Sequence, residues 1–216
     1  TPGAGTAYRA LIGAGIGATG DTALLLRHTL SSKLEMISVV GQIVHSSASL
    51  GHSLEQLHRY LRLMADVVLP DQQDRFELLN TAGELWIVDH LVVPNDEYLA
   101  VEASFARFIS EFRRSFPGVT FEMALEVTYP APPHVDTYPD LFRVPVAFNS
   151  TRNALRSDPV WGTEDSEFEP GNAYAFGIFT SHADSLLAGL KTETSTRALV
   201  EAQILPRLHE GSISMD

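Results

Sequence analysis

Residues 95–129, NDEYLAVEASFARFISEFRRSFPGVTFEMALEVTY, contain the two patterns that decide the fold class of this chain. In the first pattern apolar side chains recur every three or four residues, which predicts a long helix that begins after the capping residue Asn95. Pro117 and Gly118 end this helix. In the second pattern, from Phe121 to Tyr129, apolar and polar residues alternate, which predicts a strand with one buried face. The apolar stripe of the helix consists of Tyr98, Val101, Phe105, Phe108, Ile109 and Phe112.

The segment before this stretch begins with three predicted helices. Residues 22–30 and 36–47 have helical patterns, and a third helix is expected to start at Ser53, which can form a capping box with Gln56. The third helix places its leucines on one face, because they recur at spacings of three and four residues. We expect that face to pack against the rest of the domain.

The remaining elements complete an α+β layout. Two β-prone runs, residues 75–80 and 84–93, are joined by a short connection that is typical of an antiparallel hairpin. After the strand at 121–129 we expect, in order, a helical turn, a strand, a turn, an acidic loop and two helices: residues 136–142, 144–148, 149–153, 163–172, 173–190 and 194–209. N-terminal helices, an antiparallel sheet crossed by a long helix, and C-terminal linker helices make an α+β fold. The acidic loop is the expected boundary between a regulatory domain, residues 1–170, and a helical linker, residues 171–216.

The composition argues against several classes of protein. The 216 residues include 27 acidic and 15 basic ones, and the net charge of −12 repels a phosphate backbone, so the chain alone is expected to bind nucleic acid poorly. No Cys is present, which excludes thiolate metal sites and cysteine nucleophiles and suits a reducing cytoplasm. The longest apolar stretches are shorter than the roughly 20 residues of a membrane helix. We therefore expect a cytoplasmic protein without a membrane partner.

The motifs that suggest catalysis are incomplete. Gly15, Gly17 and Gly20 satisfy the dinucleotide-binding pattern G-x-G-x-x-G, but the acidic residue that would hold the ribose is missing where the next strand would end. We interpret this segment as a small-residue helix that ends at Gly20. Ser53 lies in a sequence like a nucleophile elbow that lacks the second Gly. The eight His residues show no spacing typical of helical zinc ligands, so we expect no catalytic residue, no cofactor and no metal site.

A ligand pocket is the remaining interpretation of several polar and aromatic residues. Trp86 and His90 share one face of a predicted strand, and Tyr129 ends another strand, so these residues belong either to an aromatic-lined pocket or simply to the core. The pocket is expected between the sheet and the long helix, or beside the helix that starts at Ser53. The predicted lining residues are Tyr60, Trp86, His90, Arg107 and Tyr129.

Two series of short phrases resemble a known family. The first series is Thr19-Gly20-Asp21, Val40-Gly41, Ser53-Leu54-Glu55-Gln56-Leu57 and Arg59-Tyr60-Leu61. The second is Val127-Thr128-Tyr129-Pro130-Ala131-Pro132, Tyr138, Leu141-Phe142, Pro145-Val146-Ala147-Phe148 and Asn153-Ala154-Leu155. In this order and spacing they resemble the N-terminal ligand-sensing, arabinose-binding-type domain of AraC/XylS-family transcription regulators, over roughly residues 1–161.

The resemblance implies a regulatory function rather than catalysis. It implies a small-molecule effector, which it does not name because family members answer to varied metabolites. It also implies that DNA is bound only through a helix-turn-helix domain that follows Asp216. Two alternatives stay open: a dimerisation module that binds no ligand, and a nucleotide-dependent enzyme that uses Gly15, Gly17 and Gly20.

The second linker helix is the expected dimer surface. Thr194 can cap a helix that is too apolar to lie fully exposed, and few neighbours in the sequence remain to cover it. Symmetric pairing is the commonest solution for soluble homo-oligomers, and regulators of the resembled type are often dimers. The predicted contacts are Leu199, Ile204 and Leu208.

Overall fold

The structure is a computed structural model that describes residues 4–36, 38–64, 74–81, 84–92, 98–115, 122–157 and 171–190. The elements before the sheet are α1 (Ala4–Thr19), α2 (Leu24–Ser31), η1 (Leu34–Met36), α3 (Val39–His45), α4 (Leu50–Tyr60) and η2 (Leu61–Met64), where η denotes a 3-10 helix. The strands are β1 (Phe76–Thr81), β2 (Glu84–Asp89), β3 (Met123–Glu126), β4 (Val146–Ala147) and β5 (Asn153–Ser157). The other helices are α5 (Leu99–Ser115), η4 (Val135–Thr137), α6 (Tyr138–Leu141) and a helix at residues 173–190. The predicted α+β class is confirmed.

The strands form one sheet in the order β1-β2-β5-β3-β4. The predicted hairpin of β1 and β2 is confirmed, and Phe76 lies opposite Asp89 in it. The sequence pattern predicts no strand after the turn at 149–153, but the chain continues as β5, which is antiparallel to both β2 and β3. β5 contains Asn, Ala and Ser, which have low β-propensity, and burial within the sheet outweighs that preference. β4 pairs with β3 in parallel, so the sheet is mixed rather than antiparallel throughout.

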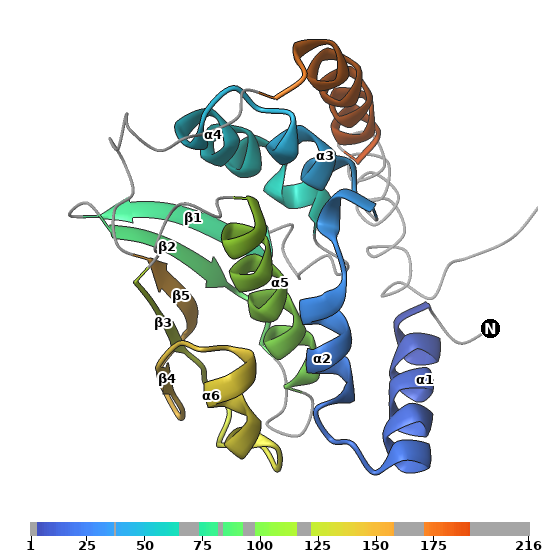
Figure 1. The fold of residues 1–216 in the computed structure, drawn as a ribbon, viewed down its shortest axis with the longest axis vertical. Coiled ribbons are helices and arrows are strands. Elements are labelled where there is room, and N and C mark those ends of the chain that lie inside the picture. The colour runs from blue at the N-terminus through green and yellow to red at the C-terminus, as the bar shows by residue number, and fades with distance from the viewer. Residues whose placement is uncertain are drawn as a thin grey trace, which may run out of the picture.

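Helix α5 crosses one face of the sheet, and α2 packs against the other side of α5 (Figure 1). On the sheet side Val101, Phe105 and Ile109 have no exposed surface, and the rings of Phe108 and Phe76 meet edge to face at 5.3 Å. Because helices also cover the far side of α5, its acidic residues Glu102 and Glu111 are buried as well. The long helix therefore carries ionisable groups into the interior of the domain.

The glycine-rich N-terminal segment is helical. Gly15 and Gly17 lie inside α1, which ends at Thr19, and Gly20 follows with a φ of +70°. This confirms the interpretation of the segment as a small-residue helix that ends at Gly20. A phosphate-binding turn would instead lie between a strand and a helix, so the G-x-G-x-x-G pattern does not form one here.

The start of α4 differs from the prediction. The helix begins at Leu50, and its N-cap is Ser49, whose hydroxyl accepts a hydrogen bond from the His52 N–H at 3.1 Å. Ser53 is already inside the helix and donates to the Val44 carbonyl at 3.1 Å, so it joins α4 to α3. The predicted capping box at Ser53 is therefore wrong. Ser49 offers an equally good cap one turn earlier, and the helix starts directly after it.

The helix at residues 173–190 lies against α4 and the turn before it (Figure 1). The Gly171 N–H donates to the Ser47 carbonyl at 3.1 Å. A Cβ at Gly171 would lie 2.2 Å from the carbonyl carbon of Ser46, so only glycine fits where the chain passes this close to Ser46. The predicted helix at 194–209 lies outside the described residues. Within the described ranges, no helix combines the length and the hydropathy needed to cross a membrane.

Candidate functional site

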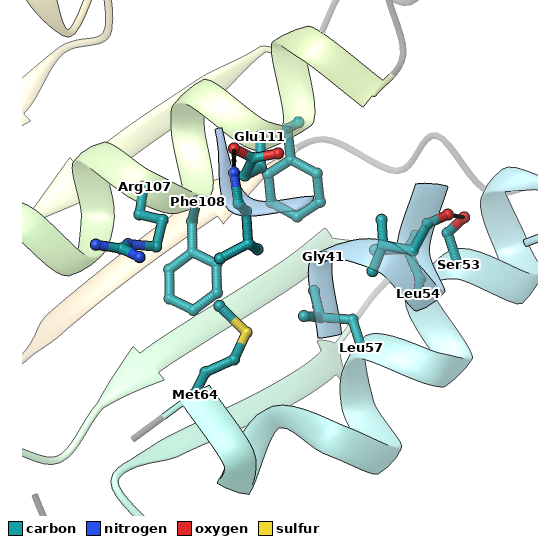
Figure 2. A pocket seen from close by; sticks show the side chains of 11 residues that line it. Gly41, Ser53, Leu54, Leu57, Met64, Arg107, Phe108 and Glu111 are labelled. Atoms are coloured by element: carbon teal, nitrogen blue, oxygen red, sulfur yellow. Dashed lines mark hydrogen bonds between the residues drawn. The ribbon is translucent and has the colours of Figure 1, made fainter. Parts of the chain in front are cut away.

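A small apolar hollow lies between α5 on one side and α3, α4 and η2 on the other (Figure 2). Its volume is about 30 Å³. In Figure 2 Phe108 of α5 faces Met64 of η2 and Leu57 of α4, whereas the guanidinium of Arg107 points away from the hollow. The lining residues are Leu34, Gly41, Val44, Ser53, Leu54, Leu57, Met64, Arg107, Phe108, Glu111 and Phe112.

Two charged residues of α5 border this apolar hollow. Arg107 is half-buried, and its guanidinium forms no hydrogen bond or ion pair with another described residue. Glu111 is buried; its Oε1 accepts the Leu34 N–H at 2.9 Å and also pairs with Arg114. Burial alone would raise the pKa of Glu111, but hydrogen bonds from His45 and Leu34 and the charge of Arg114 lower it below its ordinary value. Glu111 is thus a carboxylate with partners, whereas Arg107 is a cation without one in the described part of the chain.

A larger polar groove of about 460 Å³ lies on the other side of α4. It is bordered by α4 and η2, by the edge strand β1, and by Leu187 of the helix at 173–190. Two of its basic side chains already have partners: the His90 Nε2 lies 2.9 Å from Glu77 Oε2, and the Arg62 Nε lies 3.2 Å from Asp74 Oδ1.

Helix α4 connects the apolar hollow to the helix at 173–190. The guanidinium of Arg59 donates to both oxygens of Asp184, at 2.8 and 2.9 Å. The hydroxyl of Tyr60 donates to Asp184 Oδ1 at 2.9 Å, and burial together with this hydrogen bond raises the pKa of Tyr60 to about 12. On another side of the same helix Leu54 and Leu57 line the hollow.

Residues 4–164 match the family model of the arabinose-binding domain found at the N-terminus of AraC transcription regulators. The chain belongs to this family. The predicted resemblance is therefore confirmed, and the AraC-type domain described here is part of a family of transcription regulators. The family name describes a group of domains and does not identify the effector of this one.

A solved structure with a similar fold is the crystal structure of the transcriptional regulator CdpR from Pseudomonas aeruginosa. It is 16% identical, with a TM-score of 0.54, over 78% of this chain and 53% of that chain. At this identity the likeness shows the fold alone, and this chain spans about half the length of that regulator. No curated protein matches the chain.

The AraC-type domain does not gather the predicted lining residues into one site. Arg107 borders the apolar hollow and His90 borders the polar groove. Tyr60 is fully buried against the helix at 173–190. Trp86 is half-buried on the sheet face opposite α5, where the Arg152 guanidinium lies 4.1 Å from the centre of its ring. Tyr129 is buried, and its ring centre lies 5.1 Å from that of Tyr98, next to the first turn of α5.

A buried polar cluster near the start of α5 was not predicted. Its centre is Glu102, which has no exposed surface and whose Oε1 lies 2.6 Å from His134 Nε2 and accepts the Tyr138 hydroxyl at 2.5 Å. Burial raises the pKa of Tyr129 and of Tyr138, and the charge of Glu102 adds to the effect. The only signal in the sequence was an acidic residue next to the apolar stripe of the long helix, which is normally a solvated position.

The predicted dimer contacts Leu199, Ile204 and Leu208 lie outside the described residues. They stay predictions, as do the division into residues 1–170 and 171–216 and the ligand roles of Tyr60, Trp86, His90, Arg107 and Tyr129.

Proposed function

We propose that this AraC-type domain senses a small molecule in the apolar hollow between α4 and α5 and regulates an adjoining DNA-binding domain through the helix at 173–190. The observation that carries the proposal is the position of α4. One side of α4 lines the hollow with Leu54 and Leu57, and another side holds Asp184 of the helix at 173–190 through Arg59 and Tyr60.

The chemistry of the hollow favours an acidic ligand with an apolar body. Apolar side chains line the hollow, and at its edge Arg107, whose guanidinium points away from the hollow, supplies a cation that no described residue pairs (Figure 2). A ligand whose apolar body fills the opened hollow and whose carboxylate extends past its edge to this guanidinium would gain charge-assisted hydrogen bonds. The polar groove is larger, but its side chains Arg62 and His90 already contact Asp74 and Glu77. We therefore prefer the hollow as the site.

Binding requires the hollow to open, and this requirement supports a regulatory role. Ligand pockets for small organic molecules usually hold about 300–1,000 Å³, whereas this hollow holds about 30 Å³. A ligand would move α4 and η2 away from α5, and α4 would shift the contacts of Asp184. A ligand regulates a protein only by binding two conformations with different affinities. Here the open and closed positions of α4 would be those conformations.

The rest of the proposal concerns the whole regulator. DNA recognition is assigned to an adjoining helix-turn-helix domain, because this acidic chain repels phosphate. We propose a cytoplasmic regulator that performs no catalysis. Fluorescence anisotropy with duplex DNA tests whether DNA recognition belongs to the adjoining domain. Tight, salt-sensitive binding by residues 1–216 alone would contradict this assignment.

The ligand assignment is tested by a melting-temperature screen with aliphatic and aromatic carboxylic acids and their uncharged amides. An acid at 100 times its Kd should stabilise the folded chain by about 2.7 kcal/mol, and its amide should not. Arg107→Gln should weaken binding of that acid by roughly 10–100-fold, since one charge-assisted contact contributes about 1.5–3 kcal/mol.

The matched control is Arg62→Gln in the polar groove. We expect it to leave acid binding unchanged. If Arg62→Gln abolishes binding and Arg107→Gln does not, the ligand lies in the groove instead. If no acid in the screen binds, the assignment of Arg107 is wrong, and a module that only dimerises becomes the better interpretation.

We further propose that the helices after residue 171 form a symmetric homodimer contact. Beyond the predicted contacts at Leu199, Ile204 and Leu208, the helix at 173–190 exposes 80% of Tyr174, 50% of Ile178 and 42% of Leu186. These residues recur at intervals of four and eight, which places them on one side of the helix. Such an apolar side favours a protein contact.

Light scattering of a variant with Leu199→Glu and Ile204→Glu tests the dimer. The wild-type chain should have the mass of a dimer, and the variant should be a folded monomer by circular dichroism. A monomeric wild type, or a variant that stays dimeric, would contradict this interface. Unfolding of the variant would show that these residues belong to the core.

A further inference from the structure

Three potential metal ligands meet where η1, α3 and α5 come together. They are Glu35, His45 and Glu111, and one ligand atom from each lies within 4.8 Å of the other two. The His45 Nε2 lies 3.5 Å from Glu35 Oε2 and 3.5 Å from Glu111 Oε2. Each residue belongs to a different element, so no spacing in the sequence could have revealed the group.

These separations match the geometry of a bound ion. Zinc binds imidazole nitrogen and carboxylate oxygen at about 2.0–2.2 Å, and two ligand atoms of a tetrahedral site are then about 3.4 Å apart. Both distances from His45 agree with this value. Only the separation of the two carboxylates has to shorten, and a cation between them would draw them together.

The charges and hydrogen bonds of the group also favour a cation. Glu35 Oε2 is buried and accepts no hydrogen bond among the described residues. Glu111 turns its other oxygen, Oε1, to the Leu34 N–H and to Arg114, which leaves Oε2 directed at His45. With a neutral imidazole, the two carboxylates outweigh the single positive charge of Arg114, and a cation would balance the remaining negative charge.

The backbone holds two of the ligands together. Gly41 lies one helical turn before His45, so the two residues occupy the same side of α3. A Cβ at Gly41 would lie 2.5 Å from the Leu34 carbonyl carbon and 2.6 Å from the Glu35 nitrogen, so only glycine lets α3 approach η1 this closely. The side-chain amide of Gln42 also donates to the Glu35 carbonyl.

We propose that Glu35, His45 and Glu111 form a binding site for a divalent transition-metal ion of the zinc type. The nitrogen and oxygen donors suit such an ion, and three protein ligands leave a position for water. The side chains of Glu35 and His45 are 22% and 28% exposed, so the ion can enter from solvent. The bound ion would hold η1 and α3 against α5 beside the apolar hollow. Leu34 of η1, Gly41 of α3 and Glu111 of α5 line that hollow.

The test uses chain 1–216 without a polyhistidine tag, dialysed against a chelator and then titrated with Zn²⁺ by calorimetry. We expect one ion per chain, and at 100 times the Kd a rise in melting temperature of roughly 5–10 °C. His45→Gln and Glu35→Gln should each weaken binding by at least about 100-fold, because even loss of an outer-shell partner costs 10–100-fold. The matched control, His28→Gln on the exposed side of α2, should bind as tightly as the wild type.

A second measurement keeps the proposal testable if His45→Gln fails to fold. Paramagnetic Co²⁺ should broaden the amide signals of Leu34 and Gly41 and leave that of Ala124 in β3 sharp. The proposal is overturned if the wild type binds no Zn²⁺, if the variants bind as tightly as the wild type, or if Co²⁺ broadens other amides first. These outcomes do not bear on the proposed acid ligand, which is tested separately by the carboxylic-acid screen and by Arg107→Gln.

Discussion

Asp89→Ala is expected to lower the free energy of unfolding by about 3–5 kcal/mol, because it leaves a buried arginine without its counter-ion. Asp89 is 3% exposed and Arg75 is 4% exposed. Their two hydrogen bonds measure 3.0 and 2.8 Å. Arg75 also donates to the Ala100 carbonyl at 3.2 Å and to Ser104 Oγ at 2.8 Å, so the pair joins the end of β2 and the residue before β1 to α5.

Urea unfolding followed by circular dichroism measures this loss. The matched control is Glu126→Ala, which removes the partner of Arg152 in an exposed pair at 2.9 Å and should cost under about 1 kcal/mol. Asp89→Ala combined with Arg75→Met should cost less than the sum of the two single changes, since the double variant has no unpaired buried charge. Equal losses for Asp89→Ala and Glu126→Ala would mean that the Arg75 pair is not buried in solution.

Glu102→Ala is expected to cost a similar amount, about 3–5 kcal/mol. The substitution removes the only carboxylate in contact with the buried side chains of His134 and Tyr138 among the described residues. It also opens a cavity beneath the first turn of α5, next to Tyr98. Two polar groups that lose their acceptor in the interior cost about 1–3 kcal/mol each.

Glu102→Gln separates the hydrogen-bond acceptor from the charge. The amide oxygen can still accept from both donors, so the loss in urea unfolding should be roughly half of that for alanine. Absorbance titration of the tyrosines gives a second readout of unfolding. The buried hydroxyls of Tyr129 and Tyr138 should stay neutral until the chain unfolds at high pH. If the glutamine and alanine variants lose equal stability, the charge matters and the hydrogen-bond acceptor does not.

The candidate sites were predicted less completely than the fold. Arg107 was among the predicted lining residues, and it lies at the edge of a hollow on α5. Trp86 and Tyr129 were grouped because both were predicted to lie on strands, but Tyr129 follows β3 and packs against Tyr98, whereas Trp86 lies on the opposite face of the sheet. The cluster around Glu102 and the group at His45 were missed, because each joins residues from three or more segments distant in the chain.

The α+β class, most of the elements in their order, and the family were predictable from the sequence alone. Apolar residues at helical or strand spacing report local burial, which depends on the side chains of one segment, so α5 and β3 were predictable. The remaining features depend on contacts between distant segments. The place of β5 in the middle of the sheet, the parallel pairing of β4, and the burial of Glu102 and Glu111 depend on what packs against each segment. Such contacts between distant segments leave no periodic pattern in the sequence, and they position every polar group from which a site is proposed here.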